Sequence, residues 1–141
     1  MSLLHQASCI AIRRRAVLIE GPAGSGKSSL ALALLDRGAE LIGDDGVTLS
    51  VRDERLLASP PPRIAGLIEV CNVGLLTRPT VAGVPVVLVL TLDPQAPRFI
   101  EQAELAVRAG VTIPLVRLWP DSPVLHLRAE LALDRYGLTA D

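Results

Sequence analysis

The stretch from Gly21 to Ser28 carries the residue types best suited to chemistry in this chain. It fits the pattern G-x-x-x-x-G-K-[ST] at every fixed position. Glycines let a loop point several backbone N–H groups at a phosphate, and a following helix adds its positive dipole end. The lysine would place its charge on β- and γ-phosphates, and the last serine could bind Mg²⁺. We therefore predict a phosphate-binding loop made of Gly21, Pro22, Ala23, Gly24, Ser25, Gly26, Lys27 and Ser28.

The residues on either side of this loop predict the strand and the helix that a phosphate-binding loop connects. The apolar residues 16–20 lead into it as a strand, and the leucine-rich residues 30–35 lead out as a helix. A glycine-rich turn with a chance lysine is the alternative interpretation. That alternative does not account for a strand and a helix in register on both sides.

Two adjacent carboxylates, Asp44 and Asp45, follow a short strand predicted at residues 40–43. Ligands of open α/β sheets bind at the carboxyl ends of strands. Successive side chains of an extended backbone alternate faces, so we expect only one of the two to point inward. One could take a proton from an attacking hydroxyl while the other holds a neighbour or the metal. An acidic pair in solvent is the alternative, which the nearby phosphate-binding loop disfavours.

Three further polar residues deserve separate interpretations. Glu69 lies inside the apolar run 67–70, where a carboxylate is costly unless it is paired or binds a cation. A metal ligand and a partnered core residue both fit this position, and Ser28 slightly favours the metal. His5 precedes a strand, as many surface histidines do, and His126 falls on a predicted helix as a half-exposed residue.

Composition limits the classes of function. The chain has 141 residues, enough for one domain with a proper core, and 50% of them are hydrophobic. Only three residues are aromatic and the net charge is −1, which argues against a nucleic-acid-binding surface. No apolar span is long enough for a membrane helix, and residues 1–12 lack the features of a secretion signal. Two separated cysteines, Cys9 and Cys71, suit a reducing cytoplasm.

The remaining pattern predicts one α/β domain over residues 1–141, with a mixed, aliphatic-cored sheet flanked by helices. Residues 84–92 read as its most buried strand. Residues 104–108 and 111–118 fit a hairpin across Gly110, and residues 100–109 fit a helix equally well. Further predicted strands are 8–12, 47–52 and 55–58, with apolar pieces at 64–70 and 73–76. Helices are predicted at 27–36 and at 123–136, with Ser122 as the expected N-cap and Pro123 as the first helical residue.

This ordered set of segments resembles the C-terminal catalytic domain of the HPr kinase/phosphorylase family. These bacterial enzymes phosphorylate a serine of the phosphocarrier protein HPr. The resemblance covers most of residues 4–92. It consists of a histidine before the first strand, V-L-I-x-G-x-x-G-x-G-K-S, L-A-L-x-L-x-x-R-G-A-x-L-[IV]-x-D-D, P-P-P-R-I-A-G-L-I-E-V and x-x-x-G-[IL]-L.

The resemblance implies roles for individual residues. His5 matches the family's active-site histidine and Lys27 its loop lysine. Asp45 matches the aspartate that removes the proton from the substrate serine and returns it in the reverse reaction. The family also has an arginine that acts late in the chain, for which Arg98 is the best candidate here.

The resemblance also implies ligands, partners and a setting. Ser28 and Glu69 match positions associated with magnesium, so ATP and Mg²⁺ are the expected ligands. HPr is the expected protein substrate, with no nucleic acid and no membrane partner. The fold would be the one shared by HPr kinase and PEP carboxykinase, in a cytoplasmic homo-oligomer. Without an N-terminal regulatory domain, the chain would be similar to the short alphaproteobacterial members.

Two departures from the family pattern keep alternatives open. The signature I-E-[IV]-R-G-x-G has Cys71-Asn72 in place of Arg-Gly, and Ser29 replaces the usual acidic residue after G-K-S. Cysteine cannot replace a bidentate arginine contact to phosphate. A P-loop protein that senses a nucleotide or phosphate without catalysis is therefore one alternative. A P-loop kinase that acts on a small molecule is the other.

Overall fold

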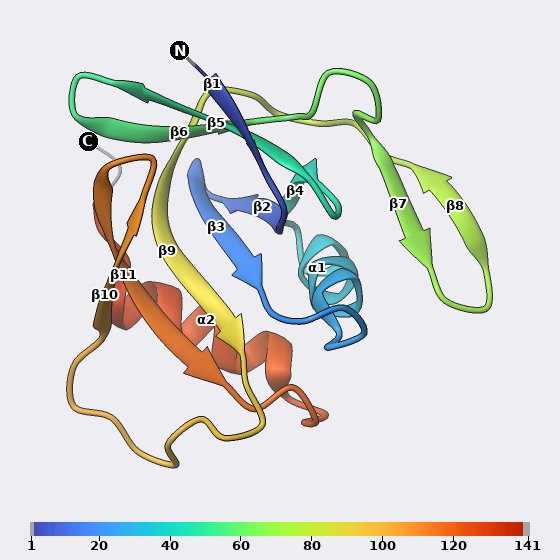
Figure 1. Ribbon diagram of the computed structural model, residues 1–141. Helices are drawn as coiled ribbons and strands as arrows, with labels where there is room; N and C mark the ends of the chain where they lie inside the picture. The colour runs from blue at the N-terminus through green and yellow to red at the C-terminus, as the bar shows by residue number, and fades with distance from the viewer. Residues whose placement is uncertain (1, 140–141) are drawn as a thin grey trace.

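The computed structural model describes residues 2–139 and confirms the predicted α/β class (Figure 1). Nine strands form one mixed sheet, and two more form a separate hairpin. The elements are β1 (Ser2–His5), β2 (Ser8–Ile12), β3 (Arg15–Glu20), α1 (Lys27–Asp36), β4 (Glu40–Gly43), β5 (Val47–Arg52), β6 (Arg55–Ser59), β7 (Leu67–Val70), β8 (Gly74–Thr77), β9 (Val84–Leu92), β10 (Glu104–Arg108), β11 (Val111–Leu118) and α2 (Leu125–Tyr136).

Strand β9 organises the sheet. Its first residues pair antiparallel with β6, and its later residues pair parallel with β3 on one side and β11 on the other. The strand order is β1-β5-β6-β9-β3-β2-β4, with β11 and then β10 attached through β9. Because β3, β9 and β11 run parallel, the loops that follow them all leave the same edge of the sheet. The phosphate-binding loop is one of these three loops.

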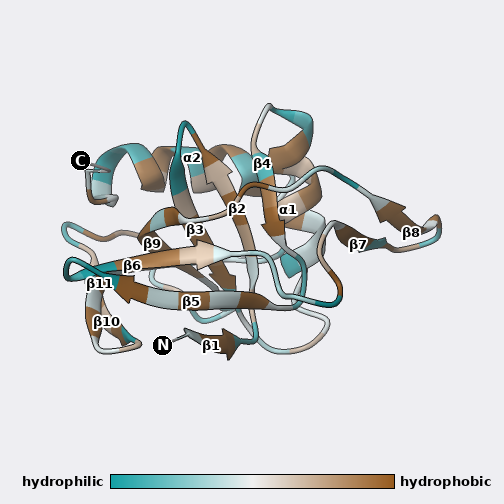
Figure 2. Ribbon diagram, turned by 90° about the horizontal axis from the view of Figure 1, so that it is seen from above, coloured by the Kyte–Doolittle hydropathy of each residue, from teal (hydrophilic) through white to brown (hydrophobic). Residues whose placement is uncertain are grey.

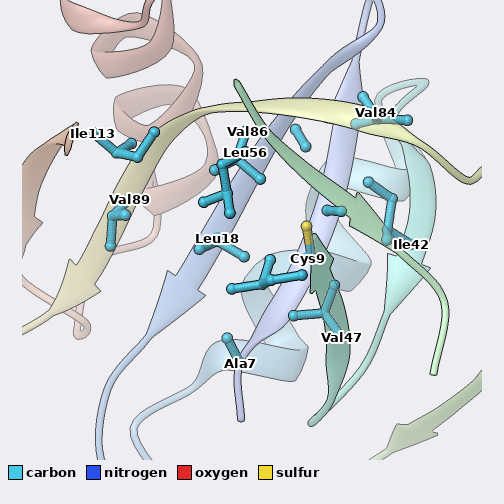
Figure 3. Close-up of a cluster of buried hydrophobic side chains, with 14 of the residues drawn as sticks. Ala7, Cys9, Leu18, Ile42, Val47, Leu56, Val84, Val86, Val89 and Ile113 are labelled. Carbon is cyan, nitrogen blue, oxygen red and sulfur yellow. The ribbon is translucent and has the colours of Figure 1, made fainter. Parts of the chain in front are cut away.

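Two aliphatic cores lie on the two faces of the sheet. One lies between β2, β3 and β9 and the strands β5 and β6 that curl over them, and it includes Cys9, Leu18, Val47 and Leu56 (Figure 3). The other lies between the sheet and the helices α1 and α2, which cover the opposite face (Figure 2). Full burial raises the pKa of the Cys9 thiol far above its ordinary value. Aliphatic packing therefore fixes the strand whose end carries the loop.

Most predicted elements are confirmed, with three differences. The hairpin of β10 and β11 replaces the alternative helix at residues 100–109. Strand β1 was not predicted; its side chains are mostly exposed, so it lacks an alternating apolar pattern. Helix α2 begins at Leu125 instead of Pro123, because Ser122 accepts a hydrogen bond from Val124 N–H in a turn before the helix. No helix of residues 2–139 is long and apolar enough to cross a membrane.

The hairpin of β7 and β8 projects from the body of the protein beside α1 (Figure 1). Only Ile68 of β7 is fully buried, and the neighbouring Glu69 is exposed. The apolar run 67–70 is therefore an alternating strand with one buried face. The interpretation of Glu69 as a partnered core residue was wrong, because its side chain is exposed; its role as a metal ligand stays a prediction.

Candidate active site

The predicted phosphate-binding loop connects β3 to α1. Gly26 caps α1 with a left-handed backbone (φ 103°), and Lys27 is the first helical residue. Gly21 is required for another reason: a Cβ there would lie 2.7 Å from Ser25 Oγ and 3.3 Å from Leu92. The loop is thus held tightly against the end of β9, with the first turn of α1 pointing at the space in front of it.

The polar groups of the loop suit a polyphosphate. The ammonium of Lys27 donates to the carbonyl oxygens of Gly21 (2.7 Å) and Pro22 (3.1 Å), which holds it folded back over the loop. The hydroxyl of Ser25 is buried without a hydrogen-bond partner among the described residues. Buried hydroxyls are seldom left unpaired, so the loop offers a donor to an anion seated in it. These residues therefore fit a phosphate chain.

Asp44 connects three elements around the start of α1. Its Oδ1 accepts hydrogen bonds from the hydroxyls of Ser28 (2.6 Å) and Ser8 (3.1 Å), and its Oδ2 accepts one from the backbone N–H of Glu69 (3.1 Å). Asp44 is nearly buried, so these bonds compensate for its desolvation. Of the two adjacent carboxylates, Asp44 is the one that holds its neighbours. The sequence did not assign this role to a specific member of the pair.

Asp45 follows Asp44 in the turn after β4, and its side chain is exposed. Its left-handed backbone (φ 59°) ends the extended geometry of β4. The expectation that only one carboxylate faces the site depended on that extended geometry, and it was wrong. Both aspartates line a cavity of about 380 Å³ together with the loop. The lining residues are Ala23, Gly24, Gly26, Lys27, Ser28, Ser29, Asp44, Asp45, Glu69 and Cys71.

The oxygen ligands in this cavity fit a magnesium–nucleotide complex. No group of three or more His, Cys, Asp or Glu side chains within residues 2–139 is arranged to hold a metal by itself. Mg²⁺ usually takes only one or two protein carboxylates and completes its shell with water and substrate phosphates. The contact between Ser28 and Asp44 supplies a hydroxyl and a carboxylate beside the loop, and Glu69 lines the same cavity.

Arg98 does not line this cavity. It is exposed in the loop after β9, at the same sheet edge. It borders a different hollow of about 420 Å³ with Arg117, Trp119 and Arg128. A catalytic role for Arg98, as the family's arginine from the later part of the chain, therefore stays a prediction.

His5 belongs to a second polar cluster, at the end of β3 that leads into the loop. Its Nε2 lies 2.7 Å from Oε2 of Glu20, the last residue of β3. The guanidinium of Arg108 donates to both oxygens of Glu20, at 2.6 and 2.9 Å. Burial alone would raise the pKa of the Glu20 carboxyl, but the hydrogen bonds and charges of Arg108 and His5 outweigh it and hold this pKa below its ordinary value. The cluster ties β1 and β10 to the strand that carries the loop.

We expect Glu20→Gln to lower the free energy of unfolding by roughly 1–3 kcal/mol at neutral pH, the size of a hydrogen bond to a charged group. The folded-state pKa of Glu20 is lowered, so the wild-type advantage exists above the unfolded pKa and is lost as the pH falls through the folded one. Urea unfolding of both proteins between neutral and acidic pH measures this. Glu101→Gln, at an exposed position, is the control. A stability difference independent of pH would contradict the ionic explanation.

Comparison with known proteins agrees with this geometry. The family model described as the HPr Serine kinase C-terminal domain matches residues 2–89, well over half of the chain. The chain belongs to this family. Curated relatives of this chain include the HPr kinase/phosphorylase of Clostridium tetani, 38% identical over 72 residues, which are 51% of this chain. That of Limosilactobacillus reuteri is 33% identical over 113 residues, covering 71% of this chain.

A solved structure extends the likeness beyond the matched segment. The structure of the Hpr(Ser) kinase/phosphatase from Coxiella burnetii superposes with a TM-score of 0.83 and 26% sequence identity, covering 94% of both chains. The alignments span 24% of the C. tetani relative and 35% of the L. reuteri relative, so this chain matches only about a quarter to a third of the length of these curated relatives. The elements β10, β11 and α2, beyond the matched residues 2–89, therefore belong to the shared fold.

Proposed function

We propose that this chain is a magnesium-dependent kinase that transfers a phosphoryl group from ATP to a serine of the phosphocarrier protein HPr. One observation carries the proposal: Lys27, on the phosphate-binding loop, and Asp45, on the turn opposite, line one cavity. An acceptor hydroxyl between them would face the phosphate chain on one side and a carboxylate on the other. The relatives named HPr kinase/phosphorylase support the choice of acceptor.

In this proposal each residue has a distinct task. The loop amides and Lys27 bind the β- and γ-phosphates and neutralise their charge. Ser28 and Asp44, with Glu69 beside them, would hold Mg²⁺, which supplies charge neutralisation on the phosphates when bound. Asp45 accepts the proton of the serine hydroxyl as its oxygen bonds to the γ-phosphorus and the bond to the ADP oxygen breaks. His5 acts indirectly, by positioning Glu20 and the end of β3.

The reverse reaction uses the same groups. Inorganic phosphate attacks the phosphorus of the phosphoserine, the bond to the serine oxygen breaks, and pyrophosphate forms. Asp45, protonated in this direction, returns its proton to the departing serine oxygen. The HPr kinase/phosphorylase names of the relatives support including this reaction. We further propose a cytoplasmic homo-oligomer as the working form. Arg98 is the candidate for the catalytic arginine that the family has in the later part of the chain.

The test is to mix the protein with Mg-ATP and HPr and to locate any phosphate by mass spectrometry. Transfer to one HPr serine supports the proposal. Nucleotide binding without transfer would instead support a sensor that no longer catalyses, an alternative favoured by Cys71, which lines the cavity in place of the family's arginine. Transfer to nucleotides or small alcohols, assayed in parallel, would support a small-molecule kinase.

A further inference from the structure

The last residues of β3, β9 and β11 lie side by side at the sheet edge that carries the phosphate-binding loop (Figure 1). A Cβ added to Gly21, the first residue of the loop, would lie 3.3 Å from the carbonyl oxygen of Leu92 at the end of β9. Leu92 is in turn the register partner of Leu118 at the end of β11. Trp119, which follows Leu118, lines the hollow of about 420 Å³ described above. The hollow therefore begins two strands from the loop, roughly 10 Å across the sheet.

This hollow and the acidic turn lie on opposite sides of the loop. Asp45 follows β4, which is separated from β3 by β2, whereas β11 pairs with the side of β9 that faces away from β3. In phosphoryl transfer the attacking and leaving oxygens are roughly in line. If the acceptor oxygen approaches from Asp45, the departing nucleoside diphosphate points away from Asp45, towards β9 and β11. A ribose and an α-phosphate span the distance from the loop to the hollow.

The side chains of the hollow suit the flat faces of a base. The indole of Trp119 is 38% exposed, and its Nε1–H donates to Ala96 O (2.6 Å), which fixes the ring against the loop after β9. The guanidinium of Arg128 lies 5.8 Å from the centroid of this ring. Bases stack on aromatic rings and on guanidinium planes. The volume of the hollow is also within the range of pockets for small molecules.

The charges of the hollow favour an anionic ligand that stacks. Arg117 is paired with Asp93 and Glu104. Arg98 and Arg128 form no ion pair with any of residues 2–139, so two positive charges face the hollow without a counter-charge. No carboxylate or amide side chain from the described part of the chain lines the hollow to read the edge of a base. The base is therefore held by its faces, which favours a purine because its face is the larger one.

We propose that the hollow at Trp119 and Arg128 binds the purine nucleoside of the triphosphate whose phosphates occupy the loop. The proposal rests on the proposed function, because it takes a nucleoside triphosphate as the phosphoryl donor. Trp119 and Arg128 contribute to nucleotide affinity and take no part in the transfer itself. A polyphosphate without a nucleoside binds the loop and leaves the hollow empty.

The unmodified protein already permits a direct test, because Trp119 is the only tryptophan of the chain. Its fluorescence therefore reports on this ring alone. Mg-ATP should change the emission of Trp119, whereas Mg-tripolyphosphate, which carries the phosphates without a nucleoside, should bind and leave the emission unchanged. Mg-UTP should bind more weakly than Mg-ATP, and equal affinities would overturn the assignment of a purine.

Two variants test the contribution of the hollow to affinity by calorimetry. Trp119→Leu should weaken Mg-ATP binding about 5- to 150-fold, the range for a lost base–aromatic stack, and Arg128→Gln at least about 5-fold. Arg135→Gln is the matched control, because Arg135 also lies on α2 over a ring, that of Tyr136 (5.7 Å), but outside the hollow. Both variants should bind Mg-tripolyphosphate as wild type does, which shows that they are folded. Arg128→Gln alone decides the test if Trp119→Leu does not fold.

Assaying HPr phosphorylation in parallel separates this proposal from the proposed function. If Mg-ATP changes the emission of Trp119 and the variants bind it weakly, but no phosphate reaches HPr, only the proposed function fails. If HPr is phosphorylated while the variants keep their affinity for Mg-ATP, only the nucleoside site fails. An emission change of equal size with Mg-tripolyphosphate or with inorganic phosphate would make the hollow a site for anions alone, which also overturns it. Binding of neither Mg-ATP nor Mg-tripolyphosphate overturns both.

Discussion

Asp45→Asn is expected to reduce phosphoryl transfer to HPr by about 10²–10⁴-fold, the range typical of a lost general base. Asparagine keeps the size of the side chain and tolerates the left-handed backbone of this position (φ 59°). Since Asp45 is exposed and Asp44 makes the hydrogen bonds that hold the turn, folding should be unaffected. The measurements are single-turnover transfer from labelled ATP and the thermal midpoint of unfolding.

A matched control exists for this variant. Asp53 is also exposed and also left-handed (φ 53°), but it lies in the turn between β5 and β6 and outside the cavity. Asp53→Asn should transfer phosphate at the wild-type rate. Asp45→Asn should still bind ATP with near-normal affinity, because its role begins with the acceptor. Near-normal transfer by Asp45→Asn would show that another group accepts the proton.

Lys27→Ala is expected to lower kcat/KM by on the order of 10²–10³-fold, the size of the loss when one group that stabilises transition-state charge is removed. The variant also loses two hydrogen bonds, to Gly21 and Pro22, so its thermal midpoint must be measured alongside. Arg52→Ala removes an exposed positive charge outside the cavity and is the control. Unchanged transfer by Lys27→Ala would exclude a catalytic role for the loop lysine.

Lys27 is the only lysine of the chain, which allows a test without mutation. Reductive methylation can modify only this side chain and the N-terminal amine. Methylation should slow phosphoryl transfer, and saturating Mg-ATP should protect Lys27 as detected by peptide mass spectrometry. Methylation of Lys27 at equal rates with and without Mg-ATP would mean that the nucleotide does not cover this lysine.

The parts of the site that were predictable from sequence are those encoded locally. The loop, its strand and its helix are consecutive, so spacing alone located Lys27 and Ser28. The turn with Asp44 and Asp45 directly follows β4, and ligands bind at the ends of strands, so an acidic pair near the site could be expected. The role of Asp45 as the base follows only from the family resemblance and stays a prediction. The hairpin of β5 and β6 could be predicted because polar turn residues separate two strands with alternating apolar and polar residues.

The parts that were missed depend on contacts between distant segments. Asp44 accepts a hydrogen bond from Ser8, which is 36 positions away in the sequence, and Glu20 accepts one from Arg108, which is 88 positions away. No periodicity signals such pairs, because each partner alone is an ordinary polar residue at the end of a strand. The sequence left a core position open for Glu69, because an apolar run of four residues fits both a buried strand and a projecting hairpin.

The two cysteines differ in a way that has a practical consequence. Cys9 is sealed in the core with a raised thiol pKa, whereas Cys71 is exposed and lines the cavity. Thiolates react and buried thiols do not, so a maleimide dye should attach to the native chain at one sulfur only. The unmodified sequence thus already contains a single attachment point for a fluorophore at the cavity mouth, where emission can report the arrival of a nucleotide in real time.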